Sequence, residues 1–266
     1  MEVWRGRTAF ITGGASGIGL GIARALGQRG MAIVLADIDA EAARQAALTL
    51  GESGVKALGL GLDVRDPQAW TAALDTAEAA FGPLAVLCSN AGVSGSVRPL
   101  TETTLEGWNW TLDVNLGGTF NAIRLGVPRL KASGLPGWFV ATSSLAPFSP
   151  SAHNGVYAAS KAAVISLCES LRAELAGSPV GVSVLVPGLV RTALLTNADR
   201  LAPSGASTGR HSPDVEAAMA ASIPADVIGE GVADGIDAGA FWLLPDPVSR
   251  RLIEAHTADI LSGVVD

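Results

Sequence analysis

The sequence predicts an α/β protein, built as one doubly wound parallel sheet of about seven strands with helices on both faces. Short apolar runs alternate along the chain with longer segments that carry apolar residues at helical spacing. The runs are continuously apolar, which is typical of strands buried on both sides of a parallel sheet. The 266 residues contain no stretch that resembles a linker, so we expect a single domain over 1–266.

The predicted strands and helices follow one another in a regular order. Each strand is a run of β-branched or apolar residues, and the helices between strands repeat apolar residues every three or four positions. This alternation predicts a Rossmann-like fold. The predicted strands cover 8–12, 32–36, 57–64, 84–88, 138–142, 182–186 and 241–244, and the clearest helices cover 18–29, 40–51, 67–81 and 157–176.

The composition argues against several classes of partner. The net charge is −7 and the chain has no basic run, so nucleic acid and anionic membranes are not expected partners. The first residues, MEVWRGRTAF, lack the profile of a signal peptide, and no apolar run approaches the roughly 18 residues that span a bilayer. We therefore expect a cytoplasmic protein.

The cysteines and histidines do not form a pattern typical of metal ligands. Cys88 and Cys168 lie in apolar surroundings without CxxC spacing, so we expect buried free thiols rather than a disulfide or a metal site. His153, His211 and His256 are too far apart in sequence for a ligand motif. No metal is therefore predicted.

A glycine-rich stretch, TGGASGIG at 12–19, follows the first predicted strand and opens the first helix. Each interior glycine costs about 0.5–1 kcal/mol relative to alanine, so this density indicates that something approaches the backbone closely. Gly13, Gly17 and Gly19 would let a pyrophosphate bind backbone N–H groups at the helix N-terminus. The spacing differs from GxGxxG, and a tight turn without a ligand is the alternative.

Polar residues also follow the second, third and fourth predicted strands. Asp37 ends the second strand about 20 residues beyond the glycines, where a carboxylate can accept both hydroxyls of an adenosine ribose. A helix N-cap is the alternative role, although Asp39 can serve it. Asp63–Val64 and Asn90–Gly92 follow the third and fourth strands. These are the strand ends at which open α/β sheets bind ligands.

Tyr157 and Lys161 lie four residues apart on a predicted helix and therefore share a face. A tyrosine has a reference pKa of about 10, and a neighbouring cation favours the phenolate. Tyr157, the only tyrosine in the chain, is thus a candidate general acid/base for an alcohol or carbonyl oxygen. On an ordinary helix, the alternative is a packed ring beside a solvated charge.

Seven motifs in one order resemble those of the classical short-chain dehydrogenase/reductase family, over nearly the whole chain. The resemblance implies that Tyr157 is the general acid/base and that Ser144, 13 residues earlier, hydrogen-bonds the reacting oxygen. It also implies that Asn115 holds a water linked to Lys161, which binds the nicotinamide ribose. Ser143 is expected to be structural. The motifs are TGGASGIG (12–19), DV (63–64), NAG (90–92), Asn115, Ser144, YAASK (157–161) and PGLVRT (187–192).

The cofactor that the resemblance implies is a nicotinamide dinucleotide, and Asp37 favours NAD. Its charge would repel the 2′-phosphate of NADP, and neither Ser16 nor Ile38 offers a cation there. The segment 187–192 is implied to line the nicotinamide, with Thr192 meeting the carboxamide. The predicted cofactor-binding residues are Gly13, Ser16, Gly17, Ile18, Gly19, Asp37, Ile38, Asp63, Val64, Asn90, Ala91, Gly92, Tyr157, Lys161, Pro187, Gly188, Val190 and Thr192.

The substrate pocket is expected beside the nicotinamide, between the segments that follow Gly92, Ser144 and Gly188. Its predicted walls are mainly apolar and suit a medium or bulky hydrophobic ketone. His153 can donate a hydrogen bond to a polar substituent, or else is an exposed loop histidine. The predicted pocket residues are Ser94, Leu145, Phe148, His153, Leu189, Leu194 and Leu195, with Val93 and Ala146 beside them.

Two segments interrupt or depart from the family pattern. Residues 193–224 are rich in Ser, Gly, Pro and Ala, and are expected to form a long loop that acts as a substrate lid. Many family members end in a glycine-rich segment after the last strand. Here Pro245 and Pro247 are followed by a predicted amphipathic helix over 247–262.

The sequence thus predicts an NAD-dependent oxidoreductase that interconverts a secondary alcohol and a ketone, with faint similarity to bacterial dehydrogenases of bulky aryl alcohols. A 3-ketoacyl reductase-type enzyme and a non-catalytic dinucleotide-binding sensor are the alternatives. The set of Asn115, Ser144, Tyr157 and Lys161 favours an enzyme, since a sensor needs no proton transfer. The apolar helices around 102–131 and 156–176 predict a homodimer or homotetramer.

Overall fold

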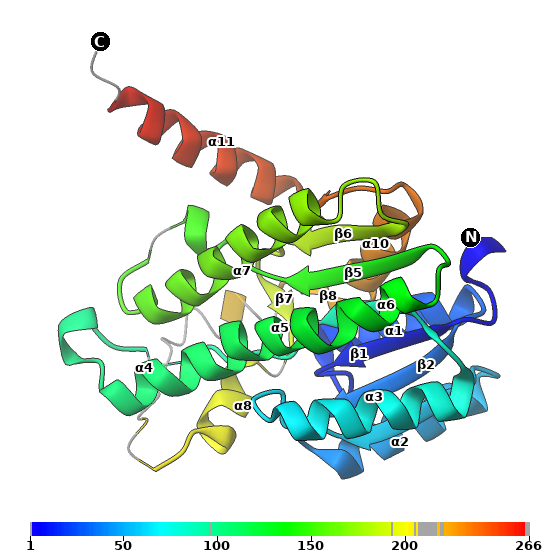
Figure 1. Ribbon diagram of the computed structural model, residues 1–266. Helices are drawn as coiled ribbons and strands as arrows, with labels where there is room; N and C mark the ends of the chain where they lie inside the picture. The colour runs from blue at the N-terminus through cyan, green and yellow to red at the C-terminus, as the bar shows by residue number, and fades with distance from the viewer. Residues whose placement is uncertain are drawn as a thin grey trace.

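The computed structural model describes residues 2–95, 97–149, 151–192, 194–204, 206, 217–218 and 221–263. In these residues, seven parallel strands form one sheet in the order β3-β2-β1-β4-β5-β6-β9 (Figure 1). The predicted fold class is confirmed. The strands are β1 (Thr8–Thr12), β2 (Ala32–Asp37), β3 (Ala57–Gly61), β4 (Leu84–Ser89), β5 (Gly137–Thr142), β6 (Val180–Leu185) and β9 (Trp242–Leu243), with β7 (Val190–Arg191) and β8 (Ile223–Pro224) paired separately.

Helices cover both faces of this sheet, as Figure 1 shows. The two faces have separate apolar cores: Trp70, Val127 and Val164 belong to one, and Ile22 and Ile228 to the other. The helices are α1 (Gly17–Gln28), α2 (Ala40–Glu52), α3 (Pro67–Phe81), α4 (Leu105–Leu112), α5 (Gly118–Asn121), α6 (Val127–Ala132), α7 (Gly155–Glu174), α8 (Leu194–Leu201), α10 (Ala225–Asp237) and α11 (Pro247–Ser262).

The helix between β4 and β5 is one long rod with two π-helical turns. Helices α4, α5 and α6 follow one another through η3 (Asp113–Gly117) and η4 (Ala122–Gly126), both of which are π-helical. A π turn inserts an extra residue into a helix and is frequent at functional sites. The first of these turns carries the predicted site residue Asn115.

The order in which strands are added to the sheet reverses between β1 and β4. The chain runs outward from β1 to β3, then returns to place β4 on the other side of β1. Such a switch point opens a crevice at the carboxyl ends of the strands. The sequence predicts a strand over 57–64, but the third strand ends at Gly61. Asp63 and Val64 therefore lie just beyond the strand and not within it.

The segment 193–224 is more regular than predicted, although much of it lies outside the described residues. Its beginning forms helix α8 (Leu194–Leu201) and its end forms β8, which pairs with β7. Leu194 and Leu201 lie two helical turns apart, a spacing that the Ser/Gly/Pro-rich composition of the whole segment masks.

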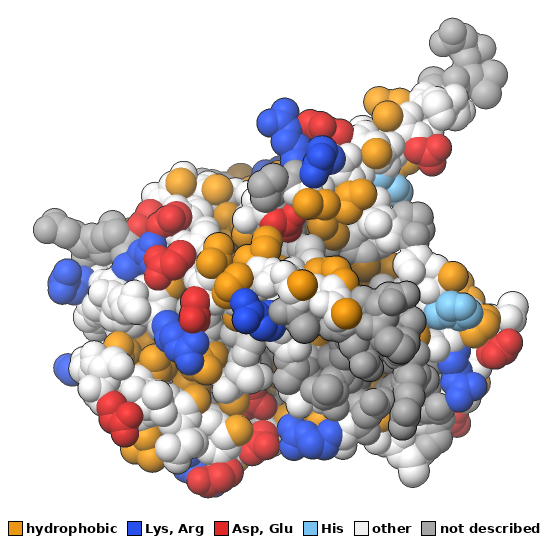
Figure 2. All heavy atoms as spheres, turned by 180° about the vertical axis from the view of Figure 1, so that it is seen from behind, with side chains coloured by type: hydrophobic (Ala, Val, Ile, Leu, Met, Phe, Trp, Pro, Cys, Tyr) orange, Lys and Arg blue, Asp and Glu red, His pale blue; other side chains and the backbone are white. Residues whose placement is uncertain are grey.

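Helix α11 (Pro247–Ser262) projects away from the body of the protein in both views (Figures 1 and 2). Of the described helices, none is both long and apolar enough to cross a bilayer. Cys88 and Cys168 are free and buried, as predicted, and burial raises the pKa of each thiol to about 12.

Candidate active site

Most of the predicted site residues line one cavity of about 1480 Å³ at the carboxyl ends of the strands, the end to which the arrows of β5 and β6 point in Figure 1. Gly19, Asn115 and Phe148 are not among its lining residues, and the side chain of Leu195 lies outside the described residues. The predicted residues that line it are Gly13, Ser16, Gly17, Ile18, Asp37, Ile38, Asp63, Val64, Asn90, Ala91, Gly92, Ser94, Ser144, Leu145, His153, Tyr157, Lys161, Pro187, Gly188, Leu189, Val190, Thr192 and Leu194.

The glycine turn before α1 has a shape that side chains would block. Gly13 and Gly17 have φ of +61° and +52°, in the left-handed region that glycine adopts most readily. A Cβ on Gly19 would overlap the carbonyl oxygen of Gly13. Ser16 precedes the helix and makes no side-chain capping hydrogen bond, so the N–H groups of the first turn lack a side-chain cap. This turn fits a pyrophosphate.

Asp37 is the last residue of β2, and its carboxylate is held in place by backbone donors. Oδ2 accepts a hydrogen bond from Ala15 N at 3.1 Å, and Oδ1 accepts one from Asp39 N at 3.1 Å. Asp39 itself caps α2 by accepting from Ala42 N at 3.0 Å. Asp37 is therefore free of the capping role and presents a fixed negative charge to the cavity.

Asn90 ties together the ends of three neighbouring strands. Its Nδ2 donates to Thr12 O at 3.0 Å, and its Oδ1 accepts from Thr142 Oγ1 at 3.1 Å. Thr12 Oγ1 in turn accepts from Asn90 N at 2.9 Å and Ala91 N at 3.0 Å. These bonds fix the floor of the cavity at the switch point between β1 and β4.

Asp63 and Val64 make contacts that the sequence did not predict. The Asp63 carboxylate is paired with Arg65 at 2.7 Å, and hydrogen bonding from this guanidinium lowers the pKa of Asp63. The Val64 carbonyl accepts hydrogen bonds from Trp70 Nε1 at 2.9 Å and Asn121 Nδ2 at 3.0 Å. The wall after β3 is thus rigid, and it includes Arg65 as a further lining residue.

Lys161 is almost completely buried, with 4% of its surface exposed. Its Nζ donates to Thr142 O at 2.8 Å, and its carbonyl accepts from Ser143 Oγ at 2.8 Å, the structural role expected of Ser143. Burial lowers the pKa of the ammonium from 10.5 to about 8. A Cβ on Gly92 would lie 3.2 Å from Lys161 Nζ, a tight contact that glycine avoids.

Tyr157 lies beside Lys161, whose Nζ is 5.8 Å from the centre of the phenol ring. Desolvation raises the pKa of Tyr157, and its hydrogen bond with Ser144 partly opposes this rise. The expectation that Lys161 lowers this pKa is wrong for the free protein. Burial lowers the pKa of Lys161 and raises that of Tyr157, so burial favours the neutral form of both side chains in the free protein.

Asn115 stands behind the cavity wall, in the π turn. Its Oδ1 accepts from Val93 N at 2.8 Å, and its Nδ2 donates to Val93 O at 3.0 Å and Ser160 Oγ at 3.0 Å. A Cβ on Gly92 would lie 3.1 Å from Asn115 Oδ1. Asn115 thus clamps the segment after β4 to α7, next to Lys161.

Some of the residues predicted to line the substrate pocket do line the cavity, and Phe148 does not. The ring of Phe148 does not line the cavity, because it packs edge-on against His256 of α11, with ring centres 5.7 Å apart. His153 lines the cavity, is exposed, and has φ of +68°, which is uncommon for a residue other than glycine. Ser94 is buried and lines the cavity.

Asp246, which sequence reasoning missed, joins α11 to the cavity. It caps the helix through Ser249 N at 2.8 Å, and its Oδ2 accepts from Gly188 N at 3.1 Å. The sequence did carry a signal, since an aspartate followed by proline is typical of a helix start. Asp246, Val248 and Leu252 line the cavity.

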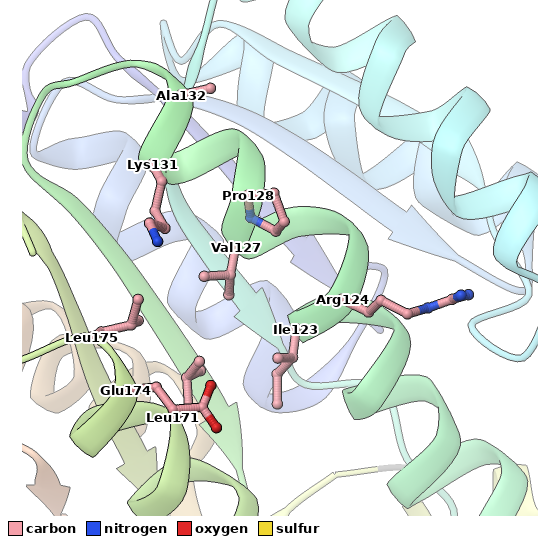
Figure 3. Close-up of a pocket in the computed structure, with 9 residues that line it drawn as sticks. All are labelled: Ile123, Arg124, Val127, Pro128, Lys131, Ala132, Leu171, Glu174 and Leu175. Atoms are coloured by element: carbon pink, nitrogen blue, oxygen red, sulfur yellow. The ribbon is translucent and has the colours of Figure 1, made fainter.

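A second hollow, of about 530 Å³, lies between α6 and α7 and contains none of the motif residues. Figure 3 shows Val127, Leu171 and Leu175 with Lys131 and Glu174 beside them, while Arg124 points away. This hollow therefore holds none of the residues proposed for catalysis or cofactor binding.

Comparisons with known proteins show the family of the chain. The profile of the family "short chain dehydrogenase" matches residues 7–201. The C alpha-dehydrogenase of Sphingobium sp. strain SYK-6 is 36% identical over 270 residues, which is 99% of this chain and 88% of that protein. The NADP-dependent (R)-specific alcohol dehydrogenase of Lentilactobacillus kefiri is 36% identical over 193 residues, or 72% of this chain and 76% of that protein.

Solved structures extend the likeness to the fold. A short chain dehydrogenase/reductase from Burkholderia phymatum, in complex with NAD, superposes with a TM-score of 0.91 at 30% identity. The superposition covers 98% of this chain and 96% of that one.

Proposed function

Since this chain belongs to the short chain dehydrogenase family, whose members are oxidoreductases of alcohols and ketones with a nicotinamide dinucleotide cofactor, we propose that it is an NAD-dependent secondary-alcohol dehydrogenase. The reverse reaction reduces the ketone. The proposed substrates are medium or bulky hydrophobic compounds, aryl ketones among them. The observation that carries the cofactor choice is the fixed carboxylate of Asp37.

The position of Asp37 supports NAD over NADP. Its oxygens are held by Ala15 N and Asp39 N at the end of β2, where a ribose 2′-hydroxyl can donate to a carboxylate. A 2′-phosphate there would meet a negative charge. Arg65, which also lines the cavity, is engaged by Asp63 and so does not balance that charge. Family membership alone does not decide this point, because a relative is named as NADP-dependent.

Tyr157 is the proposed general acid/base. A bound nicotinamide supplies or accepts the hydride, and the protein supplies geometry and the proton. The Tyr157 hydroxyl gives its proton to the carbonyl oxygen in reduction and takes it back in oxidation, while Ser144 holds the same oxygen by a hydrogen bond. Lys161, held by Thr142 O and placed beside the phenol ring, is proposed to bind the nicotinamide ribose. Asn115 positions the neighbouring segment through Val93.

The walls of the cavity support a hydrophobic substrate. Leu145, Leu189, Val248 and Leu252 line it from three separate segments. Burial of such apolar surface contributes about 25 cal/mol per Å², which suits a ring or a long alkyl group. We further propose that the segment 193–224 acts as a lid, since Leu201 and Ala206 pack with Val93 at the cavity wall.

Assembly as a homodimer or homotetramer is also proposed. The helices expected at the interface expose large apolar side chains, with Leu105 75%, Phe120 51% and Trp108 38% exposed. Contiguous apolar patches on a soluble protein commonly mark association surfaces.

A panel of secondary alcohols, scanned by NADH absorbance with NAD and then NADP, tests the function. We expect oxidation of aryl or other bulky alcohols, with kcat/KM higher for NAD. Asp37→Ala should lower this preference, since it removes the charge that repels the 2′-phosphate. Asp39→Ala, which removes a neighbouring carboxylate that caps α2, is the matched control and should keep the preference. Equal kcat/KM for both cofactors in the unaltered protein would contradict the proposal.

A further inference from the structure

Ser94 carries a hydroxyl that has no hydrogen-bond partner. The residue is 5% exposed, and its Oγ is buried without any partner in the free protein. A buried hydroxyl normally pairs, because leaving one unpaired costs a large part of its lost hydration. Ser94 also lines the cavity that holds Tyr157 and Lys161. An unpaired buried hydroxyl beside the reacting groups can form a hydrogen bond with a polar atom of a bound ligand.

The backbone on both sides of Ser94 is held by its neighbours. Val93 is held through both its N–H and its carbonyl by Asn115, at 2.8 and 3.0 Å. Gly95 has φ of +69°, and a Cβ there would overlap Thr111 Oγ1. Thr111 already donates to Gly107 O at 2.8 Å. These contacts fix the backbone from which the Ser94 side chain extends.

The location of Ser94 places it on the substrate side of the reacting groups. It lies two residues beyond Gly92, which adjoins Lys161 Nζ, and two residues span at most about 7 Å. Val93, its neighbour, packs with Trp110 and Ala206, which limits the access of water to this wall. An aryl ketone that places its carbonyl near Tyr157 has a ring long enough to bring a substituent to this wall.

On this basis, and resting on the proposed function, we infer that Ser94 is a specificity-determining residue that hydrogen-bonds a second oxygen of the substrate, separate from the reacting one. The substrate class is an aryl ketone or alcohol that carries a ring hydroxyl. A hydroxyl of serine both donates and accepts, so it suits a phenol. The apolar walls bind the ring, and Ser94 selects the substituted ring over the plain one.

Ser94→Ala tests the inference with acetophenone and its three ring-hydroxylated isomers, by NADH consumption. We expect the ratio of kcat/KM for the favoured hydroxylated isomer to that for acetophenone to fall by about 3- to 10-fold, as expected for one lost hydrogen bond. Ser149→Ala removes an exposed hydroxyl that lines the same cavity, and should keep the ratio of the unaltered protein. A ratio that Ser94→Ala leaves unchanged for all three isomers overturns the inference.

A second readout does not depend on turnover. Removal of an unpaired buried hydroxyl should leave the Tm of the free protein unchanged or raise it, and a lower Tm would assign Ser94 a structural role and overturn the inference. If the unaltered protein turns over none of these ketones, the panel of secondary alcohols decides the proposed function separately. The role of Ser94 is then tested by thermal unfolding with NADH present. The measured quantity is the rise in Tm that each hydroxylated ketone causes, in the unaltered protein and in Ser94→Ala. A smaller shift in Ser94→Ala supports the inference, and equal shifts overturn it.

Discussion

The ionisation of Tyr157 in the free protein can be predicted from its two neighbours. Lys161 Nζ lies 5.8 Å from the centre of the phenol ring, and Ser144 hydrogen-bonds the hydroxyl. A charged ammonium at that distance would stabilise the phenolate by about 3 kcal/mol at an effective dielectric constant of about 20, or about two pH units. Because burial lowers the pKa of Lys161 to about 8, that charge is absent when Tyr157 ionises.

Lys161→Met should therefore leave the Tyr157 midpoint within about half a pH unit of its value in the unaltered protein. Ser144→Ala should raise the midpoint by about one unit, since a hydrogen bond to a charged oxygen is about 1–1.5 kcal/mol stronger than one to a neutral oxygen. In both the unaltered protein and Ser144→Ala, the midpoint should lie above the reference value of about 10.

The assay uses the fact that Tyr157 is the only tyrosine in the chain. The ultraviolet absorbance of the phenolate then reports on this residue alone, and circular dichroism identifies the pH range in which the protein stays folded. Ser143→Ala is the control, because that serine bonds the backbone of Lys161 rather than the phenol. A rise of about two units in Lys161→Met would refute the reasoning, as would a midpoint below 10 in the unaltered protein.

Three further predictions follow from the same site and surface. Since burial lowers the pKa of Lys161 from 10.5 to about 8, the folded protein releases this proton before the unfolded chain does. Its free energy of unfolding should rise by about 3 kcal/mol between pH 8 and 10.5, and denaturant titrations of Lys161→Met should lack that rise. Tyr157→Phe should lower turnover by about 10²–10⁴-fold, measured by stopped-flow, and should retain NADH binding, measured by fluorescence titration. Full turnover in this variant would show that Tyr157 is not the general acid/base. Sedimentation should show a dimer or tetramer, and Phe120→Glu should shift it toward monomer, because a charge would then lie on the exposed apolar helix face. A stable monomer of the unaltered protein at micromolar concentration would contradict the proposed assembly.

Much of the fold was predictable because its signals are local. Continuous apolar runs mark buried parallel strands, and the glycine turn after β1 needs left-handed residues at Gly13 and Gly17. Asp37 was predictable as a strand-end residue because the length of β2 follows from its apolar run. Each of these features depends on residues within a few positions of one another.

The parts that sequence reasoning missed depend on contacts between distant segments. Phe148 packs its ring against His256, more than a hundred residues later, and does not line the cavity. Thr142 was absent from the predicted site, although its carbonyl accepts a hydrogen bond from Lys161 Nζ. Any residue has a backbone carbonyl, so the residue type at this position does not indicate the contact. The order in which Lys161 and Tyr157 lose their protons depends on burial, which spacing along a helix does not reveal.

Asp246 shows how the atypical C-terminal segment becomes part of the active site. One carboxylate oxygen caps α11 through Ser249 N, and the other accepts from both Ser249 Oγ at 2.6 Å and Gly188 N. The helix start and the PGLVRT segment therefore share a single buried side chain, which is 6% exposed. A movement of α11 must strain these bonds or move Gly188 with it. Because α11 also places Val248 and Leu252 at the cavity, the same helix both shapes the proposed substrate pocket and fixes the loop beside it.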